Sequence, residues 1–74
     1  MTPLMLRQLW AVVESAQAQI LLNLDDSSLA QWLLRQLKAQ RSLDSDETNL
    51  LNAYIQTKMP LIRDLAEERI VTHS

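Results

Sequence analysis

The sequence predicts an all-α fold, a bundle of three antiparallel helices whose third helix is long and kinked at a proline. The first observation is composition: the 74 residues include no Gly and no Phe, while Leu, Ala and Gln are abundant. Those three residue types favour helices, and tight hairpins between strands favour Gly. The second observation is that apolar residues recur at helical spacing in three segments. A chain of this length forms one domain, residues 1–74.

The first predicted helix runs from Pro3 to about Leu22. Thr2 is suited to cap it, and proline is favoured at a first helical position because its missing N–H is not needed there. On a helical wheel its apolar side chains fill an arc about 180° wide. That arc is wider than one neighbouring helix covers. We therefore expect this helix to contact two others, or one other and a partner chain.

The second predicted helix runs from about Asp26 to Gln40, with Asp25 as its N-cap. Its apolar positions form one stripe about 140° wide, made of Leu29, Ala30, Leu33, Leu34 and Leu37. Trp32 lies about 60° outside the edge of that stripe. This position favours either an interface anchor or a tryptophan at the margin of the core with its indole N–H in water.

The third predicted helix runs from about residue 45 to residue 71. Asp44 and Glu47 have the spacing of a capping box at its start. Pro60 falls on the polar side, and the apolar spacing continues past it without a shift, so we expect one helix that bends there. The alternative is two short helices broken at 58–60, because the residue before a proline avoids the α region. The apolar arc is made of Leu50, Leu51, Tyr54, Ile55, Leu61, Ile62, Leu65 and Ala66.

The composition excludes several kinds of chemical site. There is no Cys and only one His, so a thiolate or histidine zinc site within one chain is ruled out. Phosphate-binding loops need Gly. The neighbouring carboxylates Asp64, Glu67 and Glu68 are interleaved with arginines, and Arg63 and Glu67 are spaced for an ion pair on an exposed face. We therefore predict no catalytic, cofactor-binding or metal-binding residue, and no enzyme activity.

The N-terminal segment does not resemble a targeting or membrane segment. Its longest run without a charged or amide side chain is Leu9 to Val13, shorter than a signal-peptide core or a membrane span. We expect a cytoplasmic protein that does not associate with membranes.

Self-association is expected from the size of the chain. A protein of 8.5 kDa buries about 60% of its unfolded surface, and this chain has no disulfide or metal to add stability. We therefore expect a homodimer, which would add stability by covering surplus apolar surface of the first helix. The candidate interface residues are Met5, Leu6, Trp10, Val13, Trp32 and Lys58. Lys58 is included because it lies within the apolar arc of the third helix, although its stem could lie along the core while its ammonium reaches water.

The function that these features favour is a small non-catalytic helical module for protein–protein interaction or regulation. The alternative is a helix-turn-helix-like DNA-binding regulator that uses the second and third helices, with Arg35, Lys38 and Arg41 as its basic face. Residues 44–74 weigh against nucleic acid, because they carry six acidic and three basic side chains. No cofactor is expected, and the partner is another protein or a second copy of this chain.

Overall fold

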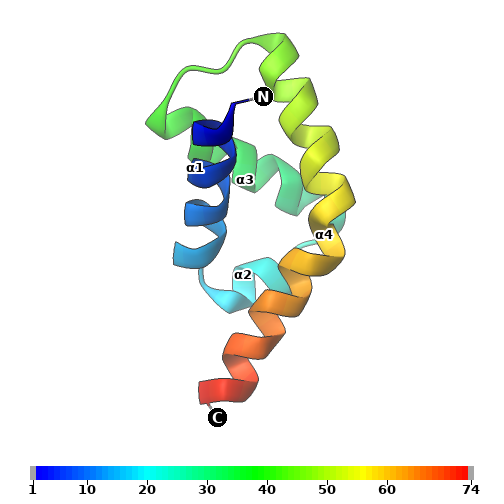
Figure 1. The fold of residues 1–74 in the computed structure, drawn as a ribbon. Helices are drawn as coiled ribbons and strands as arrows, with labels where there is room; N and C mark the ends of the chain where they lie inside the picture. The colour runs from blue at the N-terminus through cyan, green and yellow to red at the C-terminus, as the bar shows by residue number, and fades with distance from the viewer. Residues whose placement is uncertain (1, 74) are drawn as a thin grey trace.

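The computed structural model describes residues 2–73, and the side chains of residues 2–71. Within this range the chain forms four α-helices and no strand, so the all-α prediction is confirmed (Figure 1). The helices are α1 (Pro3–Ser15), α2 (Ala18–Asn23), α3 (Asp26–Gln40) and α4 (Ser45–His73). None of them combines the length and the apolar character that would be needed to cross a membrane, as far as the described residues go.

The segment predicted as the first helix is two helices, which corrects the prediction of three helices. α1 begins as expected, with the Thr2 hydroxyl oxygen 3.2 Å from the Met5 backbone nitrogen that donates to it. It ends at Ser15, because Ala16 and Gln17 adopt extended backbone with ψ of 148° and 138°. The Ser15 hydroxyl donates to the Ala11 carbonyl oxygen, a local bond of the kind that competes with helical hydrogen bonding.

α3 has the bounds that the sequence predicts. Its first turn is capped by Asp25, whose carboxylate oxygen accepts a hydrogen bond from the Ser28 backbone nitrogen at 2.7 Å. Hydrogen bonds from Ser28 hold the pKa of Asp25 below its usual value, because they stabilise the charged carboxylate. The whole predicted stripe from Leu29 to Leu37 is buried.

α4 is one helix from Ser45 to His73 and continues through Pro60. The alternative of two helices broken at 58–60 is therefore wrong. Its first turn has the predicted capping box: the Glu47 nitrogen donates to Asp44 Oδ1 at 2.7 Å, and the Asp44 nitrogen donates to Glu47 Oε1 at 3.2 Å. Pro60 is exposed, as its place on the polar side predicts. The bend at Pro60 stays a prediction.

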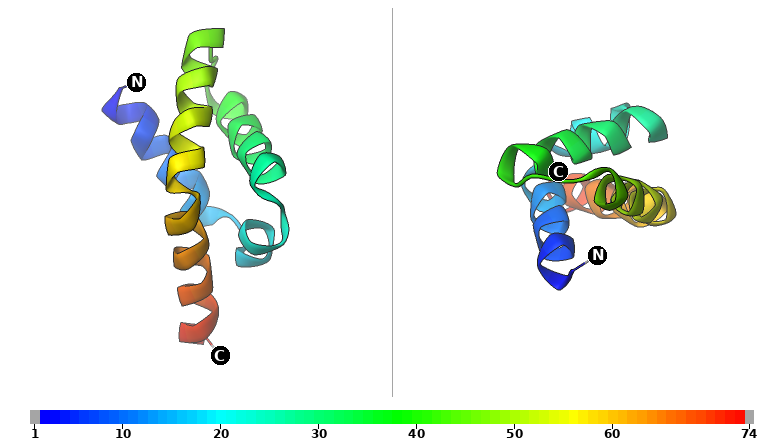
Figure 2. Two further views of the ribbon diagram at one scale, coloured as in Figure 1. Left: turned by 90° about the vertical axis from the view of Figure 1, so that its right-hand side faces the viewer. Right: turned by 90° about the horizontal axis from the view of Figure 1, so that it is seen from above.

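The long helix α4 spans the length of the molecule, and the three shorter helices gather along it (Figures 1 and 2). α3 runs in the opposite direction to α4 and packs against it, while α1 packs on α3. The short helix α2 packs against the second half of α4. The last turns of α4 extend beyond α2, and Ile70 and Val71 are exposed there.

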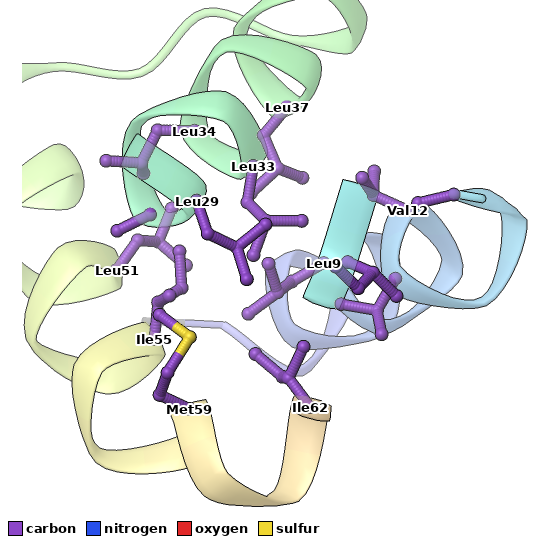
Figure 3. Packing of buried hydrophobic residues seen from close by; sticks show 14 of the residues in the cluster. Leu9, Val12, Leu29, Leu33, Leu34, Leu37, Leu51, Ile55, Met59 and Ile62 are labelled. Carbon is purple, nitrogen blue, oxygen red and sulfur yellow. The ribbon is translucent and has the colours of Figure 1, made fainter. Parts of the chain in front are cut away.

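All four helices contribute to one apolar core (Figure 3). No polar or charged side chain is buried among the described residues. The stripe that α4 contributes differs from the predicted arc: Met59 is buried, whereas Leu50, Leu61 and Leu65 are exposed. The core consists of Met5, Leu9, Val12, Val13, Ala16, Leu21, Leu29, Ala30, Leu33, Leu34, Leu37, Leu51, Ile55, Met59, Ile62 and Ala66.

This chain's own helices cover much of the apolar side of the predicted first helix. Met5, Leu9, Val12 and Val13 of α1 are buried, and α2 buries Leu21. The total accessible surface is 4800 Å², close to the roughly 4,700 Å² expected for a folded monomer of this mass. Some apolar surface of the predicted first helix stays uncovered, because Leu4 is 54% exposed and Leu6, Trp10 and Ile20 are half-buried. The large apolar side chains that remain exposed belong mostly to α4.

A core substitution should show how strongly the fold depends on this packing. Leu33 is completely buried, so Leu33→Ala is expected to lower the free energy of unfolding by about 2–5 kcal/mol. Leu50, which is 52% exposed, provides the matched control. Leu50→Ala is expected to change the free energy of unfolding by less than about 1 kcal/mol. Urea unfolding followed by circular dichroism measures both. Equal losses for the two variants would contradict the core described above.

The proline inside α4 offers a second test of the fold. Pro60 cannot donate a backbone hydrogen bond, so Pro60→Ala restores one and removes the ring from the helix interior. We expect this variant to be more stable than the natural chain, by about 1–3 kcal/mol in thermal or urea unfolding. A clear loss of stability would mean that the fold requires the geometry that the proline imposes at this point.

Candidate functional site

The strongest candidate for a functional surface surrounds Trp32 on α3. Trp32 is half-buried and packs against the core from outside. It borders two adjoining open grooves of about 360 and 380 Å³, which share Gln17, Ile20 and Trp32. We call the joint lining the Trp32 surface; it consists of Val12, Ser15, Ala16, Gln17, Gln19, Ile20, Asn23, Leu24, Trp32, Gln36 and Gln40.

The Trp32 surface carries no charged side chain. The chain has 16 charged residues among 74, yet the eleven lining residues are apolar, amide or hydroxyl in character. Five of them are side-chain amides, and Trp32 adds an indole. Few charges and an aromatic centre are the composition of the cores of protein interfaces rather than of solvated surfaces.

The interruption between α1 and α2 shapes this surface. The extended backbone at Ala16 and Gln17 turns the chain, so that α2 leaves the direction of α1 (Figure 1). Gln17 and Ile20 then lie beside Trp32 of α3, on the walls that the two grooves share. The continuous helix predicted from the sequence would not have turned at this point, and would not have placed Gln17 and Ile20 beside Trp32 in this way.

Trp10 and Lys58, both predicted as interface residues, meet at Tyr54 of α4. The Trp10 indole nitrogen donates to the Tyr54 hydroxyl at 3.0 Å, and the two rings are edge to face with centroids 6.4 Å apart. The Lys58 ammonium lies 5.8 Å from the centroid of the Tyr54 ring, a cation–π arrangement. These contacts join α1 to α4, and all three side chains are half-buried. Trp10 and Lys58 therefore have a contact within this chain, at Tyr54.

The remaining candidates lie on α1. Met5 and Val13 are almost completely buried in the core, so they offer no side-chain surface to a partner. Leu6 is half-buried at the edge of the helix. Trp32, also predicted for an interface, lies on the two grooves described above.

Two arginines of α4 hold the ends of the short helices. The Arg63 guanidinium donates to the Leu21 carbonyl oxygen of α2 at 2.6 Å and to Asp26 of α3 at 2.8 Å. Arg69 donates to the Glu14 carbonyl oxygen of α1 at 2.8 Å. Both carbonyls belong to last helical turns, where they lack helical partners and where the helix dipole attracts cations.

The predicted pairing of Arg63 with Glu67 is replaced by these contacts. An i,i+4 pair along one helix is worth only a few tenths of a kcal/mol, whereas Arg63 here joins three helices. The spacing in the sequence identifies the local partner but gives no sign of Leu21 or Asp26, because they are distant in the chain.

The basic residues considered for DNA binding do not form a uniform face. Arg35 and Lys38 are exposed on α3, whereas Arg41 is half-buried and donates to the Gln8 side-chain oxygen of α1 at 3.2 Å. The helix that follows begins with Asp46 and Glu47 in its first turn. These carboxylates follow the basic residues within a few positions in the chain, whereas DNA binding relies on cations that neutralise phosphates.

The carboxylates near the C-terminus were considered as candidates for a metal site. Among the described residues no group of three His, Cys, Asp or Glu side chains could hold a metal ion. Asp64, Glu67 and Glu68 are exposed on α4. His73 lies outside the residues whose side chains the structure describes.

No protein-family model, curated protein or solved structure gave a match to this chain.

Arg63 provides a direct test of the contacts between helices. Arg63→Gln removes hydrogen bonds from one cation to two acceptors, so we expect it to lower the free energy of unfolding by about 1.5–3 kcal/mol. The exposed Arg35 is the matched control, and Arg35→Gln should change stability by less than about 0.5 kcal/mol. Denaturant unfolding measures both, and a neutral Arg63 variant would contradict this role.

Proposed function

We propose that this chain is a small non-catalytic helical interaction module that acts as a homodimer, with the Trp32 surface as the contact between the two copies. A cytoplasmic location and a regulatory role belong to the same proposal. The observation that carries it is the uncharged lining of the two grooves around a half-buried tryptophan.

The chemistry of the Trp32 surface suits a second copy of the same chain. Across a two-fold axis, each residue near the axis meets itself or a close neighbour. Charged residues in such a position repel each other, whereas side-chain amides carry both a donor and an acceptor and can pair with their own kind. The Trp32 surface offers five amides and no charge. It therefore meets its own copy without like-charge repulsion.

Burial of the apolar side chains would supply the driving force. Trp32 and Ile20 are half-buried in the monomer, and they adjoin Val12, Ala16 and Leu24. Aromatic anchors flanked by smaller apolar groups are the residues that contribute most to binding energy in protein interfaces. The two grooves give each copy a concave surface that could receive side chains of the other.

DNA binding remains the alternative, and the charge distribution weighs against it. The helix after α3 begins with Asp46 and Glu47, and Arg41 donates a hydrogen bond to Gln8. A DNA-binding surface needs several unopposed cations along one face. Unchanged retention on a DNA column after Arg35→Glu and Lys38→Glu would eliminate this alternative.

The homodimer is tested by placing a charge in the Trp32 surface. Gln36 lines one groove, so Gln36→Lys would bring two ammonium groups close together across the axis. The matched control is Gln31→Lys, because Gln31 is exposed on the same helix and outside the lining. We expect the natural chain and Gln31→Lys to be dimers in sedimentation equilibrium, and Gln36→Lys to dissociate at least about tenfold more readily.

Trp32→Ala is a second variant of the same test. It should weaken the dimer more than it weakens the folded monomer, because the indole packs at the margin of the core. Melting followed by circular dichroism separates these two effects. A natural chain that is monomeric at about 100 µM would contradict the proposal, as would a Gln36→Lys variant that dimerises like the Gln31→Lys control.

A further inference from the structure

One side of α4 carries an apolar stripe that the fold covers only in part, where Trp10 of α1 contacts Tyr54. Leu50, Leu61 and Leu65 are 52%, 46% and 37% exposed, and Tyr54 is half-buried between them. At about 100° per residue, these four positions fall within about 60° of one another on the helix. The stripe runs about 22 Å along α4, which is the length of four helical turns. We call Leu50, Tyr54, Leu61 and Leu65 the outer stripe.

The charges beside the outer stripe are mostly negative. Asp46, Glu47 and Asp64 lie on the same side of α4, within about 40° of the stripe. Asp46 and Asp64 are exposed, while Glu47 is half-buried and accepts a hydrogen bond from the Asp44 backbone nitrogen. Lys58 is the cation at the edge of the stripe, and Arg69, which is equally near, donates to the Glu14 carbonyl oxygen of α1. Three carboxylates against the Lys58 ammonium leave this side acidic.

The packing of α4 increases this asymmetry. Its two arginines point inward, where Arg63 bonds Leu21 and Asp26 and Arg69 bonds Glu14. Their positive charges are therefore used to hold α1, α2 and α3. Asp46 and Asp64, which are exposed beside the stripe, can therefore attract positive charges of a molecule that binds there.

We propose that the outer stripe binds an amphipathic helix of another protein, with apolar side chains along one face and Lys or Arg beside them. Leu50 with Tyr54 and Leu61 with Leu65 each have the i,i+4 spacing by which one helix packs on another. The acidic flank selects basic residues in the partner and repels acidic ones. A second copy of this chain fits poorly, because pairing two outer stripes brings carboxylates against carboxylates.

This proposal does not depend on the homodimer. The Trp32 surface is formed by residues 12–40 of α1, α2 and α3, and α4 contributes nothing to its lining. One chain could use both surfaces at the same time. A dimer would then present two acidic outer stripes to two partner helices.

The probe for the experiment is a synthetic 18-residue helical peptide labelled with fluorescein, with leucines along one face and lysines beside them. Two control peptides are needed. One has the same composition with leucines distributed around the helix, and the other has glutamate in place of lysine. Fluorescence anisotropy with the full chain, at low salt and at about 0.15 M salt, measures binding. We expect the patterned basic peptide to bind at least about tenfold more tightly than either control.

Substitutions in α4 locate the binding face. The double variant Leu61→Gln and Leu65→Gln should weaken binding of the basic peptide at least about tenfold. Ile70→Gln is the matched control, because Ile70 is 45% exposed on α4 but lies about 140° from Leu65. It should bind as the natural chain does. Asp64→Asn should weaken binding and reduce its dependence on salt.

Three results would overturn the proposal. The glutamate peptide could bind as tightly as the lysine peptide, which would remove the role of charge. Ile70→Gln could weaken binding as much as the double variant, which would remove the role of the outer stripe. The double variant, shown to be folded by circular dichroism, could dissociate a dimer of the natural chain, which would assign this face to a second copy.

Discussion

The buried stripe of α4 is the constraint on which the rest of this structure depends. α1, α2 and α3 contain 13, 6 and 15 residues, and isolated helices of such lengths are marginal in water. They are stable here because their apolar sides pack into one core with Leu51, Ile55, Met59, Ile62 and Ala66 (Figure 3). α4 is therefore the element that the other three need, and its capping box and continuity through Pro60 matter for the whole chain.

The polar contacts of α4 follow from the same arrangement. A short helix has a large share of carbonyl groups without helical partners. The arginines of α4 supply donors to two such groups, Glu14 of α1 and Leu21 of α2, and Arg63 also reaches the start of α3. Because both arginines of α4 donate to other helices, Lys58 is the cation that remains beside its outer stripe. The contacts that stabilise the fold therefore affect the charge of the surface that we propose for binding.

The two surfaces proposed for binding differ in chemistry because they arise from different parts of the fold. The Trp32 surface forms where the chain turns between α1 and α2, and its amides suit a copy of itself. The outer stripe of α4 is apolar and acidic, and it suits a basic helix.

Local signals in the sequence predicted most of the helices but not their number. The sequence predicts the N-caps of α3 and α4, made by Asp25 and by Asp44 with Glu47, because a cap and its helix are neighbours in the chain. The break at Ala16 and Gln17 was missed, since no Gly or Pro marks it and it depends on contacts of α2 with distant residues of α4. Trp32 was found from its place outside the stripe. Tyr54 was assigned to the core, because nothing in the sequence relates it to Trp10.

Native-state hydrogen exchange, followed residue by residue, tests the central role of α4 most directly. We expect the amides of residues 51–66, other than Pro60, which has no amide hydrogen, to exchange only when the whole chain unfolds, and no amide of α1 or α2 to be protected longer. Slow exchange in α1 or α2 together with fast exchange in the middle of α4 would contradict it.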